Sequence, residues 1–431
     1  MNLTILTEKI NAIFNEKKLL ALAREKKFLL RSRQLNPLKL LLSVITTLGS
    51  QSKANLADIH RHYQLLSGMT INYKPFHNQI KKTQCHDFFK ECFTYVMQSW
   101  VLQSLKLTSL STGAAFPFSQ IKLHDGCSFQ VHDNLQQIYP GRFKKRFPAA
   151  VELHVTMDLL TGSIDYLALG PDTEPERPHA PQASSLHDTL LLTDAGYFDR
   201  NKIIEIDKQG GHTITQAACS INPVVVEAYD FQGNALNKAQ GKKLNTLKLH
   251  DKNSTLDLTV RWPGYDFNFR VIAFWYKKKK RIGYLVTNLA RETVPASDVV
   301  ELYRLRWQIE LLFKELKSYC NLKKFSTSNE DIVSTLIYAS FITVLLKRLM
   351  AYSTESLKSL WISTQKTART APSWLSLLVN SVSQGLPMMA VLTECIDTIA
   401  KLCERAHPKR DLKDGLYQFG VISLVNISSC G

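Results

Sequence analysis

Four polar side chains recur at helical spacing in the second half of the chain. They are Tyr303, Arg306, Glu310 and Lys317. A helix over 298–319 sets them on one narrow stripe, because each residue turns a helix by about 100°. Leucines and one isoleucine form the adjoining face, so we expect the helix to pack by that face and the stripe to border a cleft. The alternative is a salt-bridged surface flank in which Glu310 pairs with Arg306 and Lys317 is solvated.

Two aspartates upstream each follow a short apolar run that is typical of a strand. Asp125 follows Ile121–Leu123 and precedes a glycine, and Asp194 follows Leu190–Thr193. Catalytic groups of α/β folds gather at strand ends, whereas an isolated Asp before Gly is usually a turn residue. Together with Glu310 the aspartates make three hard oxygen ligands, a set that suits Mg²⁺ or Mn²⁺.

The elements that must position these residues change in type along the chain. Residues 1–115 have helical spacing almost throughout. Strand patterns begin near Phe116, and a stretch from 217 to 286 is again strand-rich, with strands expected at Val224–Ala228, Thr246–His250, Leu256–Trp262, Asn268–Tyr276 and Ile282–Thr287. This order predicts an α/β sheet with a β-rich insertion, followed by helices to about Cys403.

The N-terminal region contains a candidate helix-turn-helix. Asn55 can cap a helix over 56–66 that ends at Gly68, and a second helix over 76–82 would expose Lys81 and Lys82. Helix, short glycine turn and polar helix suit DNA binding. Any antiparallel helix pair has the same pattern, so this alternative stays open.

The charge of the chain favours a polyanionic partner. Lys and Arg number 54 against 37 Asp and Glu, a net charge of +17, with a pI of about 9.4. Residues 1–116 hold 16 of the basic residues and 6 of the acidic ones, which makes this end the expected DNA-handling surface. A generally basic surface is the alternative.

Cysteines and apolar runs argue against export and against a membrane span. The eight cysteines show no Cys-x-x-Cys pair and no Cys/His spacing for zinc, so we expect reduced thiols in a cytosolic protein. No signal-peptide pattern opens the chain. The longest apolar run, 332–346, is too short to cross a bilayer and predicts a buried helix.

The spacing on the 298–319 helix resembles a known signature. Tyr, two residues, Arg, three residues, Glu, six residues and Lys is the pattern of the DDE transposases of the YREK group, the IS-four-type family of bacterial insertion sequences. Three further segments are similar to the family's blocks around the first Asp, the second Asp and the strand before the Glu helix: Leu123–Phe129, Leu191–Asp199 and Leu285–Leu289. The resemblance covers about residues 115–350.

The resemblance implies a fold and a division into domains. The fold is α/β, a ribonuclease-H-like catalytic core interrupted by a β-strand insertion domain, with helical N-terminal and C-terminal regions. The implied domains are a DNA-binding domain at 1–115, the first part of the core at 116–216, the insertion at 217–286, the second part of the core at 287–350 and a helical region at 351–431 that is a candidate for dimerisation.

It also implies a metal-dependent DNA transposase that binds terminal inverted repeats. Asp125, Asp194 and Glu310 would be the catalytic triad and would hold two Mg²⁺ or Mn²⁺ ions per site, which serve both hydrolysis and strand transfer. Tyr303, Arg306 and Lys317 would contact phosphates at the transposon end. The expected partners are double-stranded DNA, as inverted repeats and target, and a second copy of the chain in a synaptic dimer at the bacterial nucleoid.

Further DNA contacts are expected in the insertion. Trp275, and less so Trp262, is a candidate for stacking on a flipped base, although each also suits a strand core. The basic run 277–281 either follows the DNA backbone or is a solvated turn.

Two residues depart from the family pattern, since Cys127 and Ala290 stand where a small hydroxyl residue and a proline are common. Two rival functions stay open at this point. One is a decayed transposase that binds inverted repeats without catalysis, and the other is a metal-dependent nuclease of the same fold.

Overall fold

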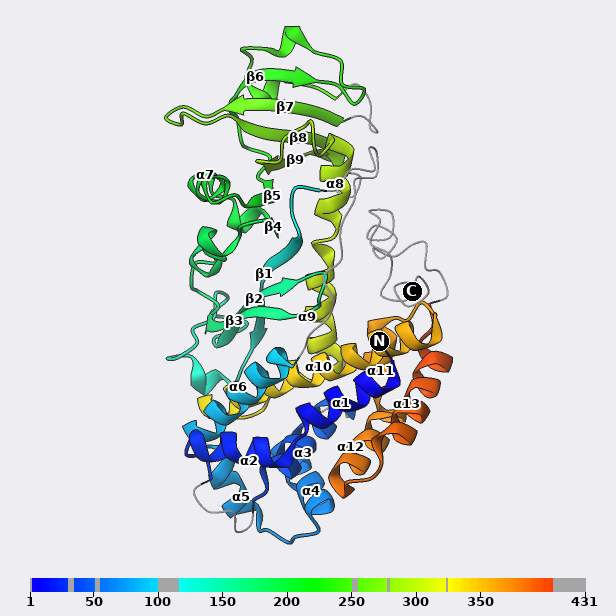
Figure 1. Ribbon diagram of the computed structural model, residues 1–431. Coiled ribbons are helices and arrows are strands. Elements are labelled where there is room, and N and C mark those ends of the chain that lie inside the picture. The colour runs from blue at the N-terminus through cyan, green and yellow to red at the C-terminus, as the bar shows by residue number, and fades with distance from the viewer. Residues whose placement is uncertain are drawn as a thin grey trace.

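The computed structural model describes residues 2–29, 35–50, 55–99, 116–249, 255–276, 280–322 and 325–405. Figure 1 shows an elongated molecule with one long sheet towards one end and helices gathered at the other. Helices α8 and α9 run between the two parts. The predicted mixed α/β class is therefore confirmed in outline.

Six helices form the N-terminal region, as the helical spacing predicts. Their bounds are α1 (Leu3–Ile13), α2 (Glu16–Glu25), α3 (Pro37–Ser50), α4 (Leu56–Ser67), α5 (Tyr73–Ile80) and α6 (Thr83–Gln98). Asn55 and Asp58 form a reciprocal capping box at the start of α4, and Gly68 ends that helix at a φ of 67°. The first helix of the candidate helix-turn-helix is thus present at the predicted place. The second begins and ends earlier than the predicted 76–82, so that Lys81 and Lys82 follow the helix instead of lying on it.

Within the described residues, nine strands form one mixed sheet. They are β1 (Gln120–Gln130), β2 (Ala150–Asp158), β3 (Ile164–Pro171), β4 (Thr189–Thr193), β5 (His212–Ala217), β6 (Val224–Tyr229), β7 (Thr255–Arg261), β8 (Phe269–Tyr276) and β9 (Arg281–Thr287), in the order β3-β2-β1-β4-β5-β9-β8-β7-β6. Strands β1, β4 and β5 are parallel neighbours, whereas every other pair is antiparallel. Helix α7 (Arg200–Lys208) connects β4 to β5.

The strand-rich stretch continues the same sheet, because β9 pairs with β5. Four of its five expected strands are present as β6 to β9. The strand expected at Thr246–His250 was wrong: Leu244–Thr246 is a 3₁₀ turn, and position 250 lies outside the described residues. Leu247 and Leu249, the apolar residues of the expected strand, are half-buried against the core of the β-rich part, so they anchor a loop instead.

The single helix expected over 298–319 is divided in two. α8 (Ala296–Arg304) and α9 (Trp307–Tyr319) are joined by a tighter turn, in which the amides of Leu305 and Arg306 donate to carbonyls three residues back. A 3₁₀ turn has fewer residues per turn and a larger rise per residue than an α-helix. Leu305 is fully buried there, so the local change keeps the apolar face against the core.

The C-terminal helices are α10 (Glu330–Lys358), α11 (Thr364–Arg369), α12 (Leu375–Gln384) and α13 (Met388–Cys403). Within the described residues α10 alone is long and apolar enough to cross a membrane, yet its most apolar stretch is wholly buried inside the protein. The prediction of a buried helix here is confirmed, although the helix is longer than the apolar run. The seven cysteines in the described ranges are free thiols.

Candidate active site

The sheet register brings Asp125 and Asp194 to adjacent places. Leu123 on β1 pairs in parallel with Leu192 on β4, and each aspartate follows its leucine by two residues. Asp194 lies just after β4, as predicted. Asp125 does not end its strand, because β1 continues to Gln130 along β2; only its pairing with β4 stops at Leu123.

The glycine after Asp125 lies close to two side chains. A Cβ on Gly126 would lie 2.9 Å from Glu152 Oε1 and 3.3 Å from the Tyr197 hydroxyl, so a side chain here would push against β2 and the segment after β4. The Gly126 amide also donates to Asp125 Oδ1 at 2.9 Å. Glycine at this position therefore serves packing as well as the orientation of the carboxylate.

Asp125 sits in an environment that disfavours its charge. Burial raises its pKa to about 7, Arg306 opposes this rise, and the nearby carboxylates of Asp194 and Glu310 add to it. The three carboxylates therefore influence one another electrostatically. A cluster of this kind needs a cation to hold all its members ionised.

Arg306 is the cation that the structure supplies. Its Nη1 donates to Asp125 Oδ2 at 3.0 Å, and its Nη2 forms an ion pair with Glu310 Oε1. The guanidinium thus stands between two carboxylates from different elements. The expected pairing of Glu310 with Arg306 on the helix occurs, but it faces the sheet rather than solvent, since the Arg306 side chain is only 16% exposed.

The rest of the helix stripe also faces the sheet. Lys317 Nζ donates to the Ser128 carbonyl on β1 at 2.7 Å, and the Tyr303 hydroxyl donates to Gln216 Oε1 on β5 at 3.4 Å. Burial raises the pKa of Tyr303 well above its usual range. The structure therefore turns all four residues of the stripe towards the sheet: Tyr303, Arg306 and Glu310 lie near Asp125, and Lys317 reaches β1 three residues further on.

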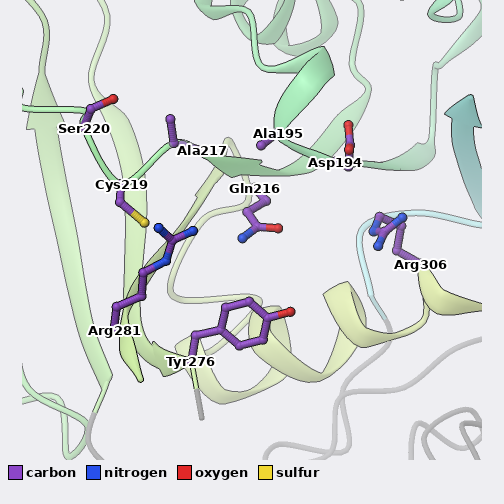
Figure 2. A pocket seen from close by; sticks show the side chains of 10 residues that line it. Asp194, Ala195, Gln216, Ala217, Cys219, Ser220, Tyr276, Arg281 and Arg306 are labelled. Atoms are coloured by element: carbon purple, nitrogen blue, oxygen red, sulfur yellow. The ribbon is translucent and has the colours of Figure 1, made fainter. Parts of the chain in front are cut away.

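A cavity of about 640 Å³ opens beside Asp194 and Arg306. Figure 2 shows Gln216, Tyr276 and Arg281 around the same space. Trp275 does not line this cavity, because neighbouring residues of a strand point to opposite faces and Tyr276 takes the cavity side. Trp262 is only 7% exposed and packs edge-on against Phe269 at 4.9 Å, so it belongs to the core of the β-rich part.

Sequence reasoning missed Tyr276 and Gln216 at this cavity, whereas Arg281 belongs to the basic run 277–281, for which contact with the DNA backbone was one of two expectations. The alternation of β8 could have assigned Trp275 and Tyr276 to opposite faces, but no sequence signal fixes which face meets the site. Residues 277–279 of the basic run lie outside the described residues. Lys280 is exposed, and Arg281 lines the cavity.

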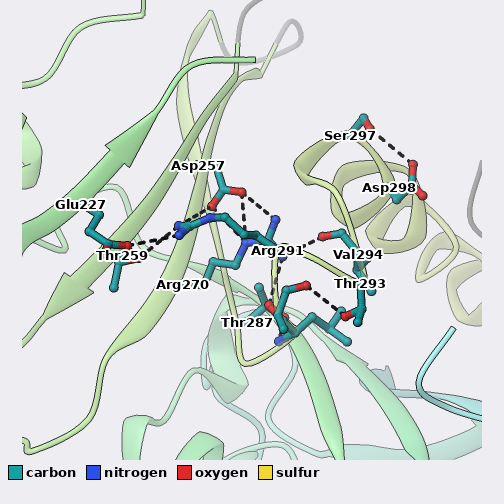
Figure 3. Close-up of polar contacts among 12 residues, drawn as sticks. Glu227, Asp257, Thr259, Arg270, Thr287, Arg291, Thr293, Val294, Ser297 and Asp298 are labelled. Carbon is teal, nitrogen blue, oxygen red and sulfur yellow. Dashed lines mark hydrogen bonds and ion pairs between the residues drawn. The ribbon is translucent and has the colours of Figure 1, made fainter. Parts of the chain in front are cut away.

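The start of α8 is tied to the β-rich part of the sheet by a buried network (Figure 3). Arg270 on β8 binds Asp257 on β7, at 2.7 Å for the shortest contact, and donates to the carbonyls of Leu289 and Val294 at 3.0 and 2.8 Å. Arg291, in the loop before α8, forms a second ion pair with Asp257 at 3.3 Å. Because these contacts span the loop before α8, they fix the direction in which Tyr303 enters the site.

Lys81 and Lys82 lie away from the carboxylates, at the junction of α5 and α6. Lys81 ends α5 and Lys82 precedes α6, and both side chains are exposed. They are therefore not part of the same cluster. Thr83, the next residue, donates to Asp331 at the start of α10 at 3.2 Å.

The residues fit a divalent cation in kind but are not arranged as a ready-made metal site. Carboxylates of Asp125, Asp194 and Glu310 are the donors that such ions prefer. Yet nowhere in the described ranges do three acidic, His or Cys side chains converge closely enough to hold an ion. Arg306 occupies the place between two of the donors.

Comparison with known proteins gives a consistent picture. The family model described as a transposase DDE domain matches residues 117–346. The transposase for insertion sequence element IS231F of Bacillus thuringiensis subsp. israelensis is 21% identical over 427 residues, which cover 90% of this chain and 89% of that protein. The transposase for IS1151 of Clostridium perfringens is 22% identical, with 82% of each chain covered.

Among solved structures, the chain is similar to the piggyBac transposase in a cryo-EM structure of its synaptic complex with hairpin DNA. That match has 9% identity and a TM-score of 0.45, and it covers 94% of this chain and 86% of the other. The family match spans more than half of the chain and includes both aspartates and the helix stripe. The chain belongs to the DDE transposases, DNA-cleaving and strand-transferring enzymes, and within them to the IS-four type of insertion-sequence transposases.

Proposed function

We propose that Asp125, Asp194 and Glu310 are the carboxylate triad with which this transposase cleaves and joins DNA at terminal inverted repeats. The observation that carries the proposal is the contact of Arg306 with both Asp125 and Glu310 beside the β1–β4 register. The contact joins Glu310 to Asp125, and the strand register sets Asp194 beside Asp125. The strand order β3-β2-β1-β4-β5, with β2 antiparallel, supports a ribonuclease-H-like core at 116–216 and 287–350.

DDE transposases use divalent metal ions. We propose that the triad holds two Mg²⁺ or Mn²⁺ ions, which when bound supply charge neutralisation and Lewis-acid activation at a phosphodiester. The chain's own residues orient the DNA end: Lys317 is fixed on β1, and Arg306 carries two donors that match a phosphate. For this contact the Arg306 guanidinium must leave the carboxylates.

The remaining parts of the chain have proposed roles in DNA handling. Residues 1–115, with exposed Lys81 and Lys82, would bind the inverted repeat, and the insertion at 217–286 would supply an aromatic ring for stacking on a flipped base. Tyr276 suits the second role better than Trp275, because it lines the cavity beside Asp194. We place the enzyme on nucleoid DNA in the bacterial cytoplasm, as a synaptic dimer to which residues 351–431 contribute.

The triad is tested by cleavage of a duplex that carries the element's terminal inverted repeat. Asp125→Asn, Asp194→Asn and Glu310→Gln should each lose nicking by at least about 10²-fold, a loss typical of removing electrostatic stabilisation at an active site. Glu301→Gln is the matched control, since among the described residues Glu301 on α8 forms its ion pair with Arg304 on the same helix. A triad variant that cleaves like the control would remove that residue from the site.

Strand transfer separates this proposal from a simple nuclease of the same fold. A precleaved end with a free 3′ hydroxyl should be joined to target DNA by the wild-type protein and by Glu301→Gln. A nuclease would cut the uncleaved duplex without forming any joined product.

A further inference from the structure

A strongly basic turn with exposed aromatic rings connects β1 and β2. We call residues 141–147 the basic loop; its sequence is Gly-Arg-Phe-Lys-Lys-Arg-Phe. Lys144, Lys145 and Arg146 are exposed, and Phe143 and Phe147 are 63% and 43% exposed. This run was visible in the sequence as three consecutive cations between phenylalanines, but the proposed site does not use it.

The base of the basic loop is held in place. The Gly141 amide donates to the Pro148 carbonyl at 2.8 Å, and the Phe147 amide donates to the Phe143 carbonyl at 2.8 Å. Arg142 is bound to Asp172 through its amide at 2.9 Å and its Nε at 3.1 Å. The loop is therefore an anchored turn whose tip holds the three other cations. No ion pair joins these three to an acidic residue in the described part of the chain.

Its position relative to the proposed triad follows from the strand. β1 runs five residues from Asp125 to its end at Gln130, roughly 17 Å at about 3.4 Å per residue. Lys317 contacts β1 along this path at Ser128. Lys317 and the cations of the basic loop therefore follow one another along β1, in the direction away from Asp125.

Just before the loop, the chain contacts the start of α10, which in turn contacts the N-terminal helices. Tyr139 donates to Glu330 at the start of α10 at 3.3 Å. The next residue, Asp331, accepts from Thr83, which follows the exposed Lys82. The basic loop therefore belongs to the segment that connects β1, which carries Asp125, with the start of α10. Lys82, just before α6, is next to the residue that contacts this start of α10.

We infer that the basic loop binds the backbone of the terminal inverted repeat, between the cleaved end and the stretch that the N-terminal helices contact. The inference rests on the proposed function. Lys144, Lys145 and Arg146 would neutralise phosphates, and Phe143 would lie against sugars or a base edge, as apolar side chains do beside basic ones in DNA grooves. At about 3.4 Å per base pair, the strand length alone corresponds to about five base pairs, and the loop follows the Pro140–Ala149 pair beyond the strand end, so these contacts would lie at least about five base pairs inside the cleaved end.

The test compares DNA binding by two double variants, without metal and in an Asp194→Asn background, so that no cleavage occurs. Lys144→Ala with Lys145→Ala removes two cations from the basic loop. Lys242→Ala with Lys243→Ala is the matched control, an exposed lysine pair in the β-rich part. The probes are the terminal-repeat duplex ending at the cleavage position, the same duplex extended into flanking DNA, and a scrambled duplex.

We expect the loop variant to bind the terminal-repeat duplex about 10- to 30-fold more weakly at physiological salt and to lower the slope of log K against log salt by about 2. The control should change neither. Phosphate ethylation at some position about five or more base pairs inside the end should interfere with the parent protein but not with the loop variant.

The outcomes separate the inference from the proposed function. If the parent protein binds terminal-repeat and scrambled duplexes equally, the proposed recognition of inverted repeats fails. If it discriminates but the loop variant behaves like the control, only the role of the basic loop is overturned. A loss confined to the flanked duplex would also overturn it, because the contact would then lie outside the element.

Discussion

In the proposed active site, Arg306 has two incompatible tasks. Its guanidinium pairs with Asp125 and Glu310, yet a DNA phosphate needs the same donors. Binding of the DNA end would release the carboxylates, and release of the carboxylates would favour a divalent ion. Contact with DNA and metal binding should therefore be coupled through one side chain.

Arg306→Gln should consequently bind Mn²⁺ more tightly than the wild-type protein when DNA is absent. Removing one positive charge from beside two carboxylates should strengthen binding at least about tenfold, or about 1.4 kcal/mol. Isothermal titration measures this directly. Lys317→Gln is the control, because Lys317 donates to a carbonyl rather than to a carboxylate. Equal Mn²⁺ affinities for all three proteins would contradict the coupling.

Tyr276 and Trp275 provide a second contrast between single residues. A duplex with 2-aminopurine next to the cleaved end should brighten when the base unstacks and dim again when an aromatic ring covers it. Tyr276→Ala should abolish the quenching, whereas Trp275→Ala should retain it, since only Tyr276 lines the cavity. The reverse result would return the stacking role to Trp275.

At the scale of elements, Lys347 on α10 joins three helix ends. Its fully buried ammonium donates to the carbonyls of Gly49 near the end of α3, Tyr319 at the end of α9 and Ala368 near the end of α11, at 2.8, 2.8 and 3.2 Å. The C-terminal ends of helices carry partial negative charge and unpaired carbonyls. One cation therefore holds the helix with Glu310 against both terminal regions.

Lys347→Met should lower the free energy of unfolding by about 2–4 kcal/mol, because it leaves buried carbonyls without partners. Lys358→Met on the same helix should cost less than about 1 kcal/mol, since Lys358 pairs with Asp397 at the surface. Urea denaturation of both variants measures the difference. Similar losses would show that the three helix ends do not depend on Lys347.

How far the elements could be predicted depended on whether their signals were local. The apolar runs before Asp125 and Asp194, the cap at Asn55 and the stripe on 298–319 all act within a few residues, so these features were predictable. The turn between α8 and α9 was not, because periodicity alone does not distinguish a 3₁₀ turn from a continuing helix. Lys347 was also unpredictable, since its Gly49 partner is 298 residues away.

At the scale of the whole molecule, one face of the sheet near the site is polar although it is buried. Every residue of β2 is buried, and Glu152, His154, Thr156 and Asp158 share one of its faces because strand residues alternate. His154 stacks on His179 from the covering segment at 3.7 Å. The sequence pattern of β2 predicted a strand, but it could not show that its polar face is covered rather than solvated.

This buried face should give the stability of the protein two opposite dependences on pH. Burial lowers the pKa of His154 from 6.5 to about 4, so between these values the unfolded chain binds a proton that the folded protein does not. Its contribution to stability therefore falls as the pH falls. Burial, with Glu176 nearby, raises the pKa of Glu152 from 4.5 to about 7. Here the folded protein binds the extra proton, so this contribution rises as the pH falls.

A variant that lacks one of the two groups should show the pH dependence of stability that the other group causes. Relative to the wild-type protein, Glu152→Gln should lose stability when the pH is lowered from 7 to 5, and His154→Gln should gain it, each by up to about 2 kcal/mol because a proton difference is worth about 1.4 kcal/mol per pH unit. Urea midpoints at both pH values, with EDTA present to remove metal ions, provide the measurement. If both variants shift in parallel with the wild-type protein, the two groups are not held in the folded protein as their burial requires.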